Sequence, residues 1–513
     1  MEAGGGLSGH RLARAGGPAV EAAHANVGRW DEEGARPLDH PVGVTSLAVP
    51  PHRDPLAGYP VTDDAFDEAV APDGTPRPEA EPALATLGGQ GLRAARAVVH
   101  EEIRARGVVY QTAAGAQPFE VDPVPRALAA REWEPLARGL EQRTRALDAF
   151  VADVYGPQRI VAEGVVPARV VGGAAYYEPL LTHLRPPAGR WIGIAGFDVV
   201  RDAGGTLAVL EDNLRTPSGV AYAMAAREAV AARAGDGAAL PLDGTVPLLG
   251  AALRAATPPA APDAAHPVVV LLTDGPPNSA YWEHAWLARA LGIPLVERAD
   301  VCRRGDRLLL RATMRPIDVV YRRTDADRAD SDLGRLLLPS VAAGTLGLVN
   351  VLGTGVADDK LVHAYVEDMI RFYLGEAPLV PSVRTFDLAR PECLTEALDR
   401  FEELVIKPRA GHGGIGVVIC PHARTEDVEA ARRAVIADPS MWVAQPLVSL
   451  STHPTVIDGR LCPRHVDLRP FVVQTADGPA ALPAALTRVA FGSGALVVNS
   501  AQDGGAKDTW IVP

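Results

Sequence analysis

The first residues that could do chemistry are Glu211, Asp212 and Asn213, which follow the apolar run TLAVL. In a β-strand, side chains two residues apart share a face, so Glu211 and Asn213 point together and Asp212 points to the other side. Carboxylate and amide oxygens are hard ligands, and they suit Mg²⁺ that carries nucleotide phosphates. The alternative is a strand-end turn whose polar residues cap the following segment, because short acidic-amide patterns are common.

A second carboxylate, Asp198, lies one predicted hairpin earlier, in the apolar strand WIGIAGFDVV. If the hairpin turns at the Asp-Ala-Gly-Gly sequence 202–205, Asp198 lies opposite Val209. It is then a diagonal neighbour of Glu211 on the same face of the sheet. The predicted metal site therefore consists of Asp198, Glu211 and Asn213.

A glycine-rich loop follows a strand that ends in a lysine, in the segment VIKPRAGHGGIGV. Such a loop lets backbone N–H groups approach phosphate oxygens, and Lys407 at the strand end adds a positive charge. The segment matches neither the Walker pattern nor the dinucleotide fingerprint, because no helix start with Lys-Ser or Lys-Thr follows. A flexible hairpin with an exposed lysine is the alternative. The glycines concerned are Gly411, Gly413, Gly414 and Gly416.

Two further segments place charged residues where a ligand could meet them. Lys360 follows an Asp-Asp pair and begins the helical pattern LVHAYVEDMIRF. The strand RHVDLRPF places His465, Asp467 and Arg469 on one face. Each segment has an ordinary alternative, which is a solvated surface lysine for the first and ion pairing across a sheet for the second.

A last segment combines Asn499, at a predicted strand end, with a glycine turn and Lys507. It could hold a phosphate or a metal, or have no binding role. None of these segments decides the chemistry alone, and the prediction of a nucleotide site depends on the whole set.

Composition and charge disfavour several other classes of protein. Lys and Arg (50) are outnumbered by Asp and Glu (63), and the formal net charge of −13 disfavours a nucleic-acid partner. The four cysteines form no CxxC pair, which argues against a disulfide framework or a zinc site. The N-terminal residues lack the apolar segment of a signal peptide, and no apolar run is long enough to span a membrane. We therefore expect a soluble, cytoplasmic protein.

The order of the predicted elements indicates an α/β protein with mixed α and β layers. Helical periodicity is predicted for residues 94–106 and 132–154. A strand at 268–273, a helix at 281–291 and a strand at 295–297 indicate a parallel α/β unit. The predicted parts are a mobile or loosely packed extension (1–60), N-terminal helices with the metal-site half of the core (61–254), a Pro/Ala-rich linker (255–267), the parallel α/β unit (268–355) and a part with the glycine loop and the remaining half of the core (356–513).

Taken together and in this order, the segments resemble the circularly permuted ATP-grasp family, type 2, a group of bacterial proteins loosely related to glutathionylspermidine synthase. Matching segments include LEDNLRTPSGVAYAMAAREA, GTGVADDKLVHAYVEDMIRFYLGE, VIKPRAGHGGIG, RHVDLRPFVV and VVNSAQDGGAKDTW. They run in family order from about Phe66 to Trp510. The resemblance implies a circularly permuted ATP-grasp fold with a pre-ATP-grasp parallel α/β unit, and it implies ATP and Mg²⁺ as cofactors.

The resemblance also assigns roles to individual residues. Lys407 and the glycines of loop 411–416 match the lysine and the lid that hold the triphosphate, and Lys360 matches an earlier lysine that touches the nucleotide. Gln445, after the lid, matches the hinge that lines the adenine pocket. The metal-binding strands precede the lid in this sequence, and this order is the permutation itself.

Further roles concern the transferred phosphoryl group. Arg469 matches the arginine that steadies this group, and Arg215 is placed to help it. Lys507 and Asn499 lie in a family signature and are assigned to the phosphate or metal site.

The resemblance implies a carboxylate–amine ligase that forms a peptide or amide bond through an acylphosphate and releases ADP and phosphate. Two alternatives stay open, a nucleotide-binding scaffold or regulator in a complex and a phosphotransferase to a non-carboxylate acceptor. The expected substrates are small-molecule or peptide acids and amines, with neither nucleic acid nor a membrane as partner. Family members often neighbour or are fused to an α-helical domain, so a separate α-helical partner protein is expected.

Two lid positions, His412 and Ile415, depart from the family pattern and bear on lid closure or on recognition of the acceptor. The sequence names neither the acid nor the amine. Candidates for the substrate pocket, with surface ion pairs and helix packing as the alternative, are Tyr281, Glu283, Arg322 and Arg323.

Overall fold

The computed structural model describes residues 56–61, 65–87, 91–112, 115–234, 237, 239–326, 328–411, 415–492, 494–495 and 504–513. The predicted N-terminal extension (1–60) lies outside the described residues except for 56–60. Within that short part, Leu56 is buried in a cluster with Ala69, Leu84 and Leu461. The last residues of the predicted extension therefore pack against the folded part of the chain.

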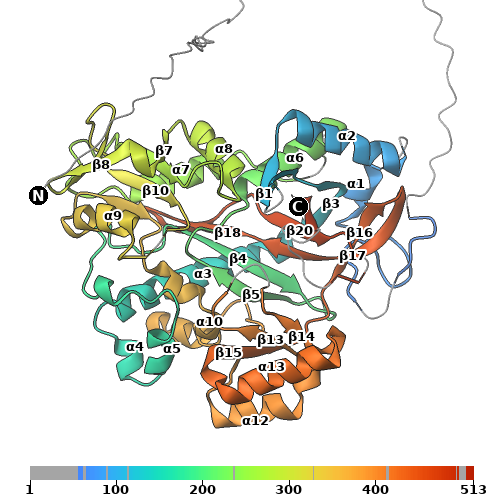
Figure 1. The fold of residues 1–513 in the computed structure, drawn as a ribbon. Coiled ribbons are helices and arrows are strands. Elements are labelled where there is room, and N and C mark those ends of the chain that lie inside the picture. The colour runs from blue at the N-terminus through green and yellow to red at the C-terminus, as the bar shows by residue number, and fades with distance from the viewer. Residues whose placement is uncertain are drawn as a thin grey trace, which may run out of the picture. The chain divides into compact units, whose positions relative to one another are not determined.

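A nine-stranded sheet contains the hairpin with the candidate metal ligands (Figure 1). In spatial order its strands are β19 (Gly478–Ala481), β18 (Phe471–Thr475), β4 (Ile194–Arg201), β17 (Arg460–Arg469), β20 (Leu486–Ala490), β21 (Gly504–Val512) and β3 (Val121–Ala129), with β5 (Leu207–Asn213) on β4 and β16 (Thr452–Ile457) on β17. The pair β21–β3 is parallel, and the other pairings are antiparallel. The predicted strand RHVDLRPF (464–471) is divided in the structure, because Pro470, which has no N–H, separates β17 from β18.

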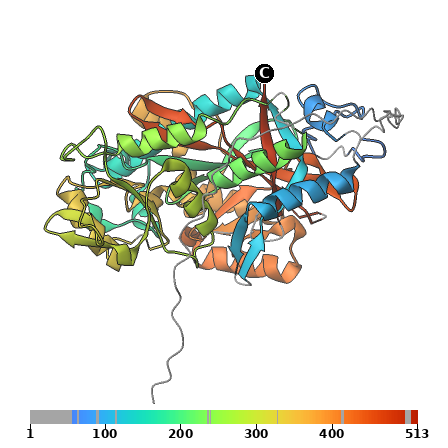
Figure 2. The ribbon, with the colours of Figure 1, turned by 90° about the horizontal axis from the view of Figure 1, so that it is seen from above.

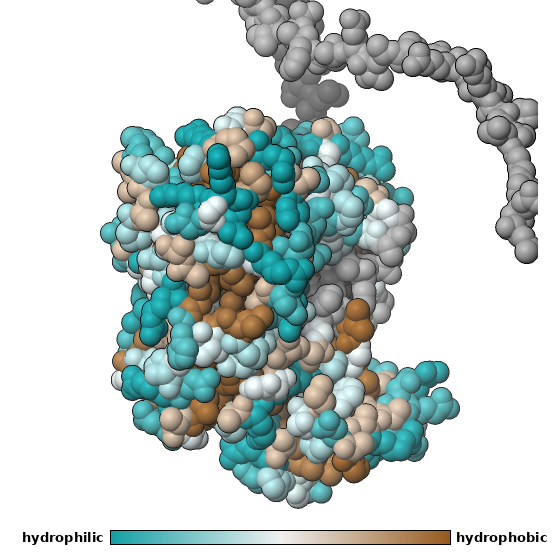
Figure 3. All heavy atoms as spheres, turned by 60° about the vertical axis from the view of Figure 1, so that its left-hand side comes forward, coloured by the Kyte–Doolittle hydropathy of each residue, from teal (hydrophilic) through white to brown (hydrophobic). Residues whose placement is uncertain are grey.

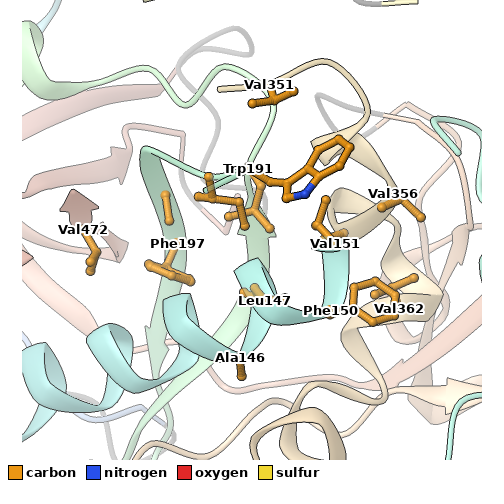
Figure 4. Close-up of a cluster of buried hydrophobic side chains, with 14 of the residues drawn as sticks. Ala146, Leu147, Phe150, Val151, Trp191, Phe197, Val351, Val356, Val362 and Val472 are labelled. Atoms are coloured by element: carbon orange, nitrogen blue, oxygen red, sulfur yellow. The ribbon is translucent and has the colours of Figure 1, made fainter. Parts of the chain in front are cut away.

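Helices cover both faces of this sheet. Successive side chains of β4 point to opposite faces, so neighbouring residues of this strand contact different helices. On one face, Phe197 packs against the long helix α3 (Ala130–Val154), beside Leu147 and Phe150 (Figure 4). On the other face lie α6 (Val220–Ala234), which packs on β21, and α7 (Thr245–Ala255), which packs on β18; both are green in Figure 2. Asp198 is one residue from Phe197, so it faces away from α3.

The predicted parallel α/β unit is present as a four-stranded sheet. Its strands are, in spatial order, β11 (Gly347–Val349), β10 (Val319–Arg323), β6 (Val269–Thr273) and β7 (Leu295–Glu297), with helices α8 (Tyr281–Leu291) and α9 (Asp332–Ala342). Every pairing in this sheet is parallel, which confirms the predicted sheet type. The segment predicted as a linker (255–267) runs from the end of α7 to the start of β6.

A smaller antiparallel sheet carries the lysine that precedes the glycine loop. Its strands are β12 (Phe386–Asp387), β15 (Trp442–Pro446), β13 (Leu404–Pro408) and β14 (Val418–Ile419), and helices α12 (Pro391–Asp399) and α13 (Thr425–Ala437) pack on it (Figure 1). Phe401, Ile406, Val435 and Ala444 form its separate apolar core. Lys407 and Gln445 are therefore held by one rigid sheet.

The remaining elements are short, apart from α2, which packs on α6. They are α1 (Glu81–Ala85), α2 (Leu92–Ala105), β1 (Val109–Thr112), β2 (Gly115–Pro118), α4 (Arg159–Ala162), α5 (Ala168–Gly172), β8 (Val301–Arg304), β9 (Arg307–Leu310), α10 (Lys360–His363), α11 (Val366–Met369) and the π-helical turn Ile370–Leu374. The prediction of one continuous helix after Lys360 is wrong. The chain forms two short helices, α10 and α11, which are separated at Tyr365. The backbone of Tyr365 (φ −110°, ψ 2°) leaves the helical region, and its hydroxyl donates a hydrogen bond to Asp387.

The face shown in Figure 3 is mixed, with several brown apolar areas between the hydrophilic residues and one of them near the middle of the view. Large apolar side chains that are exposed include Leu180, Leu379, Ile415 and Ile436. Within the described ranges, no helix has the length and apolar character needed to cross a membrane.

Candidate active site

The hairpin of β4 and β5 brings the three predicted metal ligands together. Asp198 lies directly opposite Glu211, and Asn213 lies opposite Gly196. Directly opposite residues of an antiparallel pair share a face, so the three side chains lie on one side of the sheet. The Asn213 amide also donates a hydrogen bond to Asp198 Oδ1 (3.3 Å).

The predicted register of this hairpin was wrong by one residue. Val199, and not Asp198, is opposite Val209, because the pairing shifts between Asp198 and Val199. The extra residue in β5 is Leu210, so the hairpin contains a β-bulge. The bulge turns the diagonal contact expected between Asp198 and Glu211 into a direct one.

Two arginines hold Asp198 in its ionised form. Arg469 donates to both carboxylate oxygens (Nε to Oδ1, 2.8 Å; Nη2 to Oδ2, 3.0 Å), and Arg488 adds a third hydrogen bond (2.8 Å). Burial alone would raise the pKa of Asp198, but the two arginines outweigh this effect and hold the pKa below its ordinary value. Arg469 is thus at the predicted site, and Arg488 is an additional cation that the sequence interpretation missed.

Glu211 faces a different cation. Its Oε1 lies 2.8 Å from the Lys360 ammonium, which also donates to the carbonyl oxygen of Gly411 (2.8 Å). Lys360 is the first residue of α10, and the preceding Asp359 caps that helix through the N–H of Leu361 (2.9 Å). The cap fixes where the helix starts and therefore where Lys360 points.

Lys407 and Gln445 meet on neighbouring strands of the small sheet. The Lys407 ammonium donates to Gln445 Oε1 (2.5 Å), and the Gln445 amide donates to Thr385 (2.8 Å). Burial lowers the pKa of the Lys407 ammonium, Glu211 opposes this effect, and Lys360 adds to it. Lys407 therefore lies close enough to Glu211 and Lys360 to respond to their charges.

A pocket of roughly 270 Å³ joins these groups. Four predicted residues, Glu211, Lys360, Lys407 and Gln445, line it. The other lining residues are Leu210, Asp212, Ala357, Asp358, Asp359 and His363. Of the three aspartates in the lining, Asp212 and Asp359 are paired with Arg143 and Arg409, and burial raises the pKa of Asp358 to about 7. The groups that can meet an anionic ligand together with a divalent cation are therefore the two lysines, Glu211 and the Gln445 amide.

Only part of the glycine-rich loop is described. Gly411 (φ +135°) and Gly416 (φ +76°) adopt backbone conformations that favour glycine, and Ile415 is exposed. His412, Gly413 and Gly414 lie outside the described residues, so their predicted contacts with phosphate stay predictions.

The segment after β5 is fixed by the residues predicted as substrate contacts. Arg323 donates to the Pro217 carbonyl and the Ser218 hydroxyl, and Glu283 accepts from the Gly219 N–H (2.7 Å). Both side chains are fully buried and form an ion pair (3.1 Å). In place of an open substrate pocket, these two residues form a buried support for the chain that follows the candidate metal ligands.

Arg322 and Arg215 belong to the same support. Arg322 Nη2 donates to the carbonyl of Arg215 (3.2 Å) and is almost completely buried. The Arg215 guanidinium lies 3.8 Å from the centre of the Tyr176 ring, and its charge acts on Asp358 in the pocket. Arg215 is therefore beside the pocket. Tyr281 is half-buried at the start of α8.

Lys507 does not line the pocket with Lys360 and Lys407. Its ammonium is fully buried, forms an ion pair with Asp122 and donates to the carbonyls of Pro454 (3.0 Å) and Val124 (3.3 Å). The structure therefore gives Lys507 a buried ion pair in place of the predicted ligand contact. Asn499 lies outside the described residues.

The sequence interpretation missed one signal in the composition. The 50 Lys and Arg residues include only three lysines, Lys360, Lys407 and Lys507. In a chain that uses arginine almost everywhere, a lysine marks a place where a compact ammonium is needed. Each of the three is at least partly buried.

Mg²⁺ fits the donor set on the hairpin. Asp198, Glu211 and Asn213 supply oxygen ligands, and Mg²⁺ is commonly held by one or two carboxylates together with substrate phosphates. Across the described ranges, no cluster of three or more His, Cys, Asp and Glu side chains could hold a metal.

The fold and the pocket together define an ATP-grasp protein in permuted order, and the chain belongs to the circularly permuted ATP-grasp type 2 family. The family model matches residues 125–490. The hairpin of β4 and β5 precedes the glycine loop within this range, as the permuted order requires.

Individual bacterial proteins are also similar to this chain in sequence. A Frankia casuarinae protein named "Putative glutamate--cysteine ligase 2-2" is 43% identical over 472 residues, which cover 87% of this chain and 53% of that protein. The chain thus spans about half the length of this relative. An uncharacterized protein of Synechocystis is 40% identical over 465 residues, which cover 87% of this chain and 97% of that protein.

A solved structure agrees with the fold. The apo form of a glutathione synthetase-like effector from Globodera pallida superposes with a TM-score of 0.54 at 11% sequence identity. The match covers 86% of this chain and 100% of the effector chain. At this identity the similarity concerns the fold alone.

Proposed function

We propose that the protein is an ATP- and Mg²⁺-dependent carboxylate–amine ligase. The observation that carries the proposal is the meeting of Glu211, Lys360 and Lys407 around one pocket, with Asp198 directly opposite Glu211 on the hairpin. The pocket thus offers positive charge for phosphates next to oxygen ligands for a divalent cation.

The proposed chemistry has two steps. A carboxylate oxygen of the acid attacks the γ-phosphorus of ATP, the bond to the β,γ-bridging oxygen breaks, and ADP leaves. An amine then attacks the acyl carbon, phosphate leaves, and the amine loses a proton as the amide forms. The acid needs this activation because a free carboxylate is a poor electrophile.

This chain's residues would supply charge and position. Lys360 and Lys407 would offset the negative charge of the phosphates, and Mg²⁺, held by Asp198, Glu211 and Asn213, would supply further neutralisation of that charge. We assign contact with the transferred phosphoryl group to Arg469, which donates two hydrogen bonds to the candidate metal ligand Asp198. The glycine-rich loop excludes water, which would hydrolyse the acylphosphate.

The class of substrates follows the same proposal. The Frankia relative's name refers to a ligase that joins an acid to an amine, which supports small acids, amino acids or peptides as substrates. A cytoplasmic location and a separate α-helical partner protein stay predictions.

The proposal is tested with hydroxylamine as the amine. The purified protein is incubated with ATP, Mg²⁺ and a broad panel of amino acids, small carboxylic acids and peptides, and hydroxamate formation is measured. Lys407→Ala and Glu211→Gln are compared with Arg433→Ala and Glu429→Gln, which change exposed residues of α13. We expect hydroxamate from the wild type and the two control variants and none from the two site variants.

Two results would contradict the proposal. One is a panel that yields no hydroxamate while Lys407→Ala and Glu211→Gln leave ATP turnover unchanged. The other is a stable phosphorylated product without hydroxamate, which would identify a phosphotransferase.

A further inference from the structure

Asn350 connects the parallel α/β unit to the hairpin that carries the candidate metal ligands. It directly follows β11 of the parallel sheet, and only 3% of it is exposed. Its side chain contacts both β4 and the residue that follows β5. Asn350 is not among the residues that line the candidate nucleotide pocket, and it has no role in the chemistry proposed above.

The side-chain amide of Asn350 makes four hydrogen bonds to backbone groups. Its Oδ1 accepts from the N–H groups of Gly193 (2.7 Å) and Ile194 (2.8 Å). Its Nδ2 donates to the carbonyl oxygens of Ile194 and Leu214 (2.6 Å each). The partners of the oxygen are N–H groups and those of the nitrogen are carbonyls, so the orientation of the amide is fixed. The amide is then fully hydrogen-bonded, because it has two acceptor lone pairs and two N–H donors.

The amide lies at the open end of the hairpin, where the backbone pairing stops. The last paired residues of β4 and β5 at this end are Gly196 and Asn213, and Leu214 is the first residue beyond them. The Asn350 Nδ2 donates to one carbonyl of each strand segment, at Ile194 and Leu214. It therefore joins the two segments where a further backbone pair would otherwise be needed.

Among the candidate ligands, Asn213 depends most on this connection. The two carboxylates of the set face arginine or lysine cations, whereas Asn213 is neutral. Its side chain donates one long hydrogen bond, to Asp198 (3.3 Å). The next residue, Leu214, is held at both backbone groups, because Asp358 accepts from its N–H (2.5 Å) and Asn350 donates to its carbonyl. The end of β5, and with it Asn213, is therefore fixed by side chains from outside the hairpin.

We infer that Asn350 is a positioning residue for the divalent cation, because it holds the end of β5 where Asn213 can bind the cation together with Asp198 and Glu211. This inference rests on the proposed Mg²⁺-dependent function. Mg²⁺ demands near-ideal octahedral geometry, so a small movement of one ligand weakens its binding. Removing a group that orients a metal ligand typically lowers metal affinity about 10- to 100-fold.

The test compares Asn350→Ala with the wild type by calorimetry. The non-hydrolysable β,γ-imido analogue of ATP is titrated once in Mg²⁺ and once in EDTA. The ratio of the two dissociation constants measures what the metal adds to nucleotide binding. Asn350→Ser, which keeps a small polar group, is a milder second variant.

Gln142→Ala is the matched control. Gln142 is a buried amide on α3, and like Asn350 it is held by several hydrogen bonds. It donates to Glu376 and to the Ala377 carbonyl (2.8 Å each) and accepts from the Leu379 N–H (3.0 Å). None of these residues lines the pocket. The control therefore shows the effect of losing a buried amide away from the hairpin.

We expect the wild type and Gln142→Ala to bind the analogue at least about tenfold more tightly in Mg²⁺ than in EDTA. In Asn350→Ala this ratio should fall about tenfold, and it should also fall in Asn350→Ser. The affinity in EDTA should be the same in all four proteins, because Lys360 and Lys407 keep their places in the pocket. Thermal unfolding curves set a temperature at which each variant is folded.

A merely structural role of Asn350 would give a different pattern. If Asn350→Ala and Asn350→Ser weaken binding by the same factor in Mg²⁺ and in EDTA, or leave the wild-type ratio unchanged, the inference is overturned. It is also overturned if Gln142→Ala lowers the ratio as much as Asn350→Ala does. A wild type that does not bind the analogue in Mg²⁺ would instead contradict the proposed function, and this inference with it.

Discussion

Asp198 and Glu211 lie directly opposite each other on β4 and β5, yet they face different cations. Asp198 is held by Arg469 and Arg488, whereas Glu211 is held by Lys360. The arginines keep their partner ionised and fixed in the sheet. In the proposed function, a divalent cation would take the place of Lys360 at Glu211, and the ammonium would then meet a phosphate.

Replacing Glu211 by Gln tests this arrangement. The amide keeps the shape of the side chain but removes the charge that a divalent cation needs, so ATP turnover should fall at least about a hundredfold. The assay is ADP release at varied Mg²⁺ concentration, with Glu429→Gln as the control at an exposed position of α13. Full turnover in Glu211→Gln would remove this residue from the metal site.

The three lysines allow a direct chemical map of the pocket. Burial lowers the pKa of Lys407, so at pH 8 more of its amine is neutral and nucleophilic, and we expect it to be acetylated faster than Lys360. Lys507 has its pKa lowered by burial as well, but it is inaccessible and should react only after unfolding. Mass spectrometry after limited acetylation gives the order, and ATP with Mg²⁺ should protect both pocket lysines. Rapid acetylation of Lys507 in the folded protein would contradict its buried placement.

Lys507 should be needed for stability and not for binding. Lys507→Met leaves Asp122 as a buried charge without its cation, which costs about 3–5 kcal/mol of unfolding free energy. In Lys507→Met/Asp122→Asn the second change removes that charge and should recover part of the loss. Urea unfolding measures both variants, and calorimetry on the folded fraction should show unchanged ATP affinity. A stable Lys507→Met variant that no longer binds ATP would restore Lys507 to the ligand site.

The buried carboxyl of Asp148 gives a pH dependence with a definite sign. Asp148 accepts hydrogen bonds from the N–H groups of Trp191 and Ile192 (2.9 and 2.8 Å), and burial raises its pKa from 3.8 to about 6. The folded state therefore holds the proton more tightly than the unfolded state, and stability from this group falls as pH rises from about 4 to 6. Asp148→Asn should remove this slope.

The comparison is made by urea unfolding at several pH values. Asp148→Asn should gain stability relative to the wild type between pH 4 and 6 and keep a constant advantage above pH 6. Asp148 as a whole residue is half-buried although its carboxyl is enclosed, so solvent screening reduces the effect and we expect about 1–2 kcal/mol. A difference that does not change with pH would show that Asp148 titrates normally in the folded protein.

Local patterns predicted much of the fold. The helix at 281–291 and the strand at 295–297 match α8 and β7 residue for residue, because each has a clear apolar pattern and distinct ends. The parallel sheet followed from the alternation of strands and helices. The register of the β4–β5 hairpin could not be predicted in this way, because the expected pairing left no room for an extra residue and the structure has a bulge at Leu210.

The site was predictable where one short segment carries the chemistry. Glu211, Lys360 and Lys407 each belong to such a segment, and the fold brings them together. The role of Glu283 was not predictable, because it supports a segment about sixty residues away through a backbone contact. The contact of His363 with Asp212 was not predictable for the same reason, because Asp212 lies on a strand that is distant in the sequence.

The most direct test of the central claim is a calorimetric titration of ATP in Mg²⁺ into the wild type and Lys407→Ala, with Arg433→Ala as the control. The pocket predicts one ATP site per chain in the wild type and in the control, and an affinity at least about tenfold weaker in Lys407→Ala. Absence of ATP binding to the wild type, or equal affinity in all three proteins, would contradict the assignment of this pocket to the nucleotide.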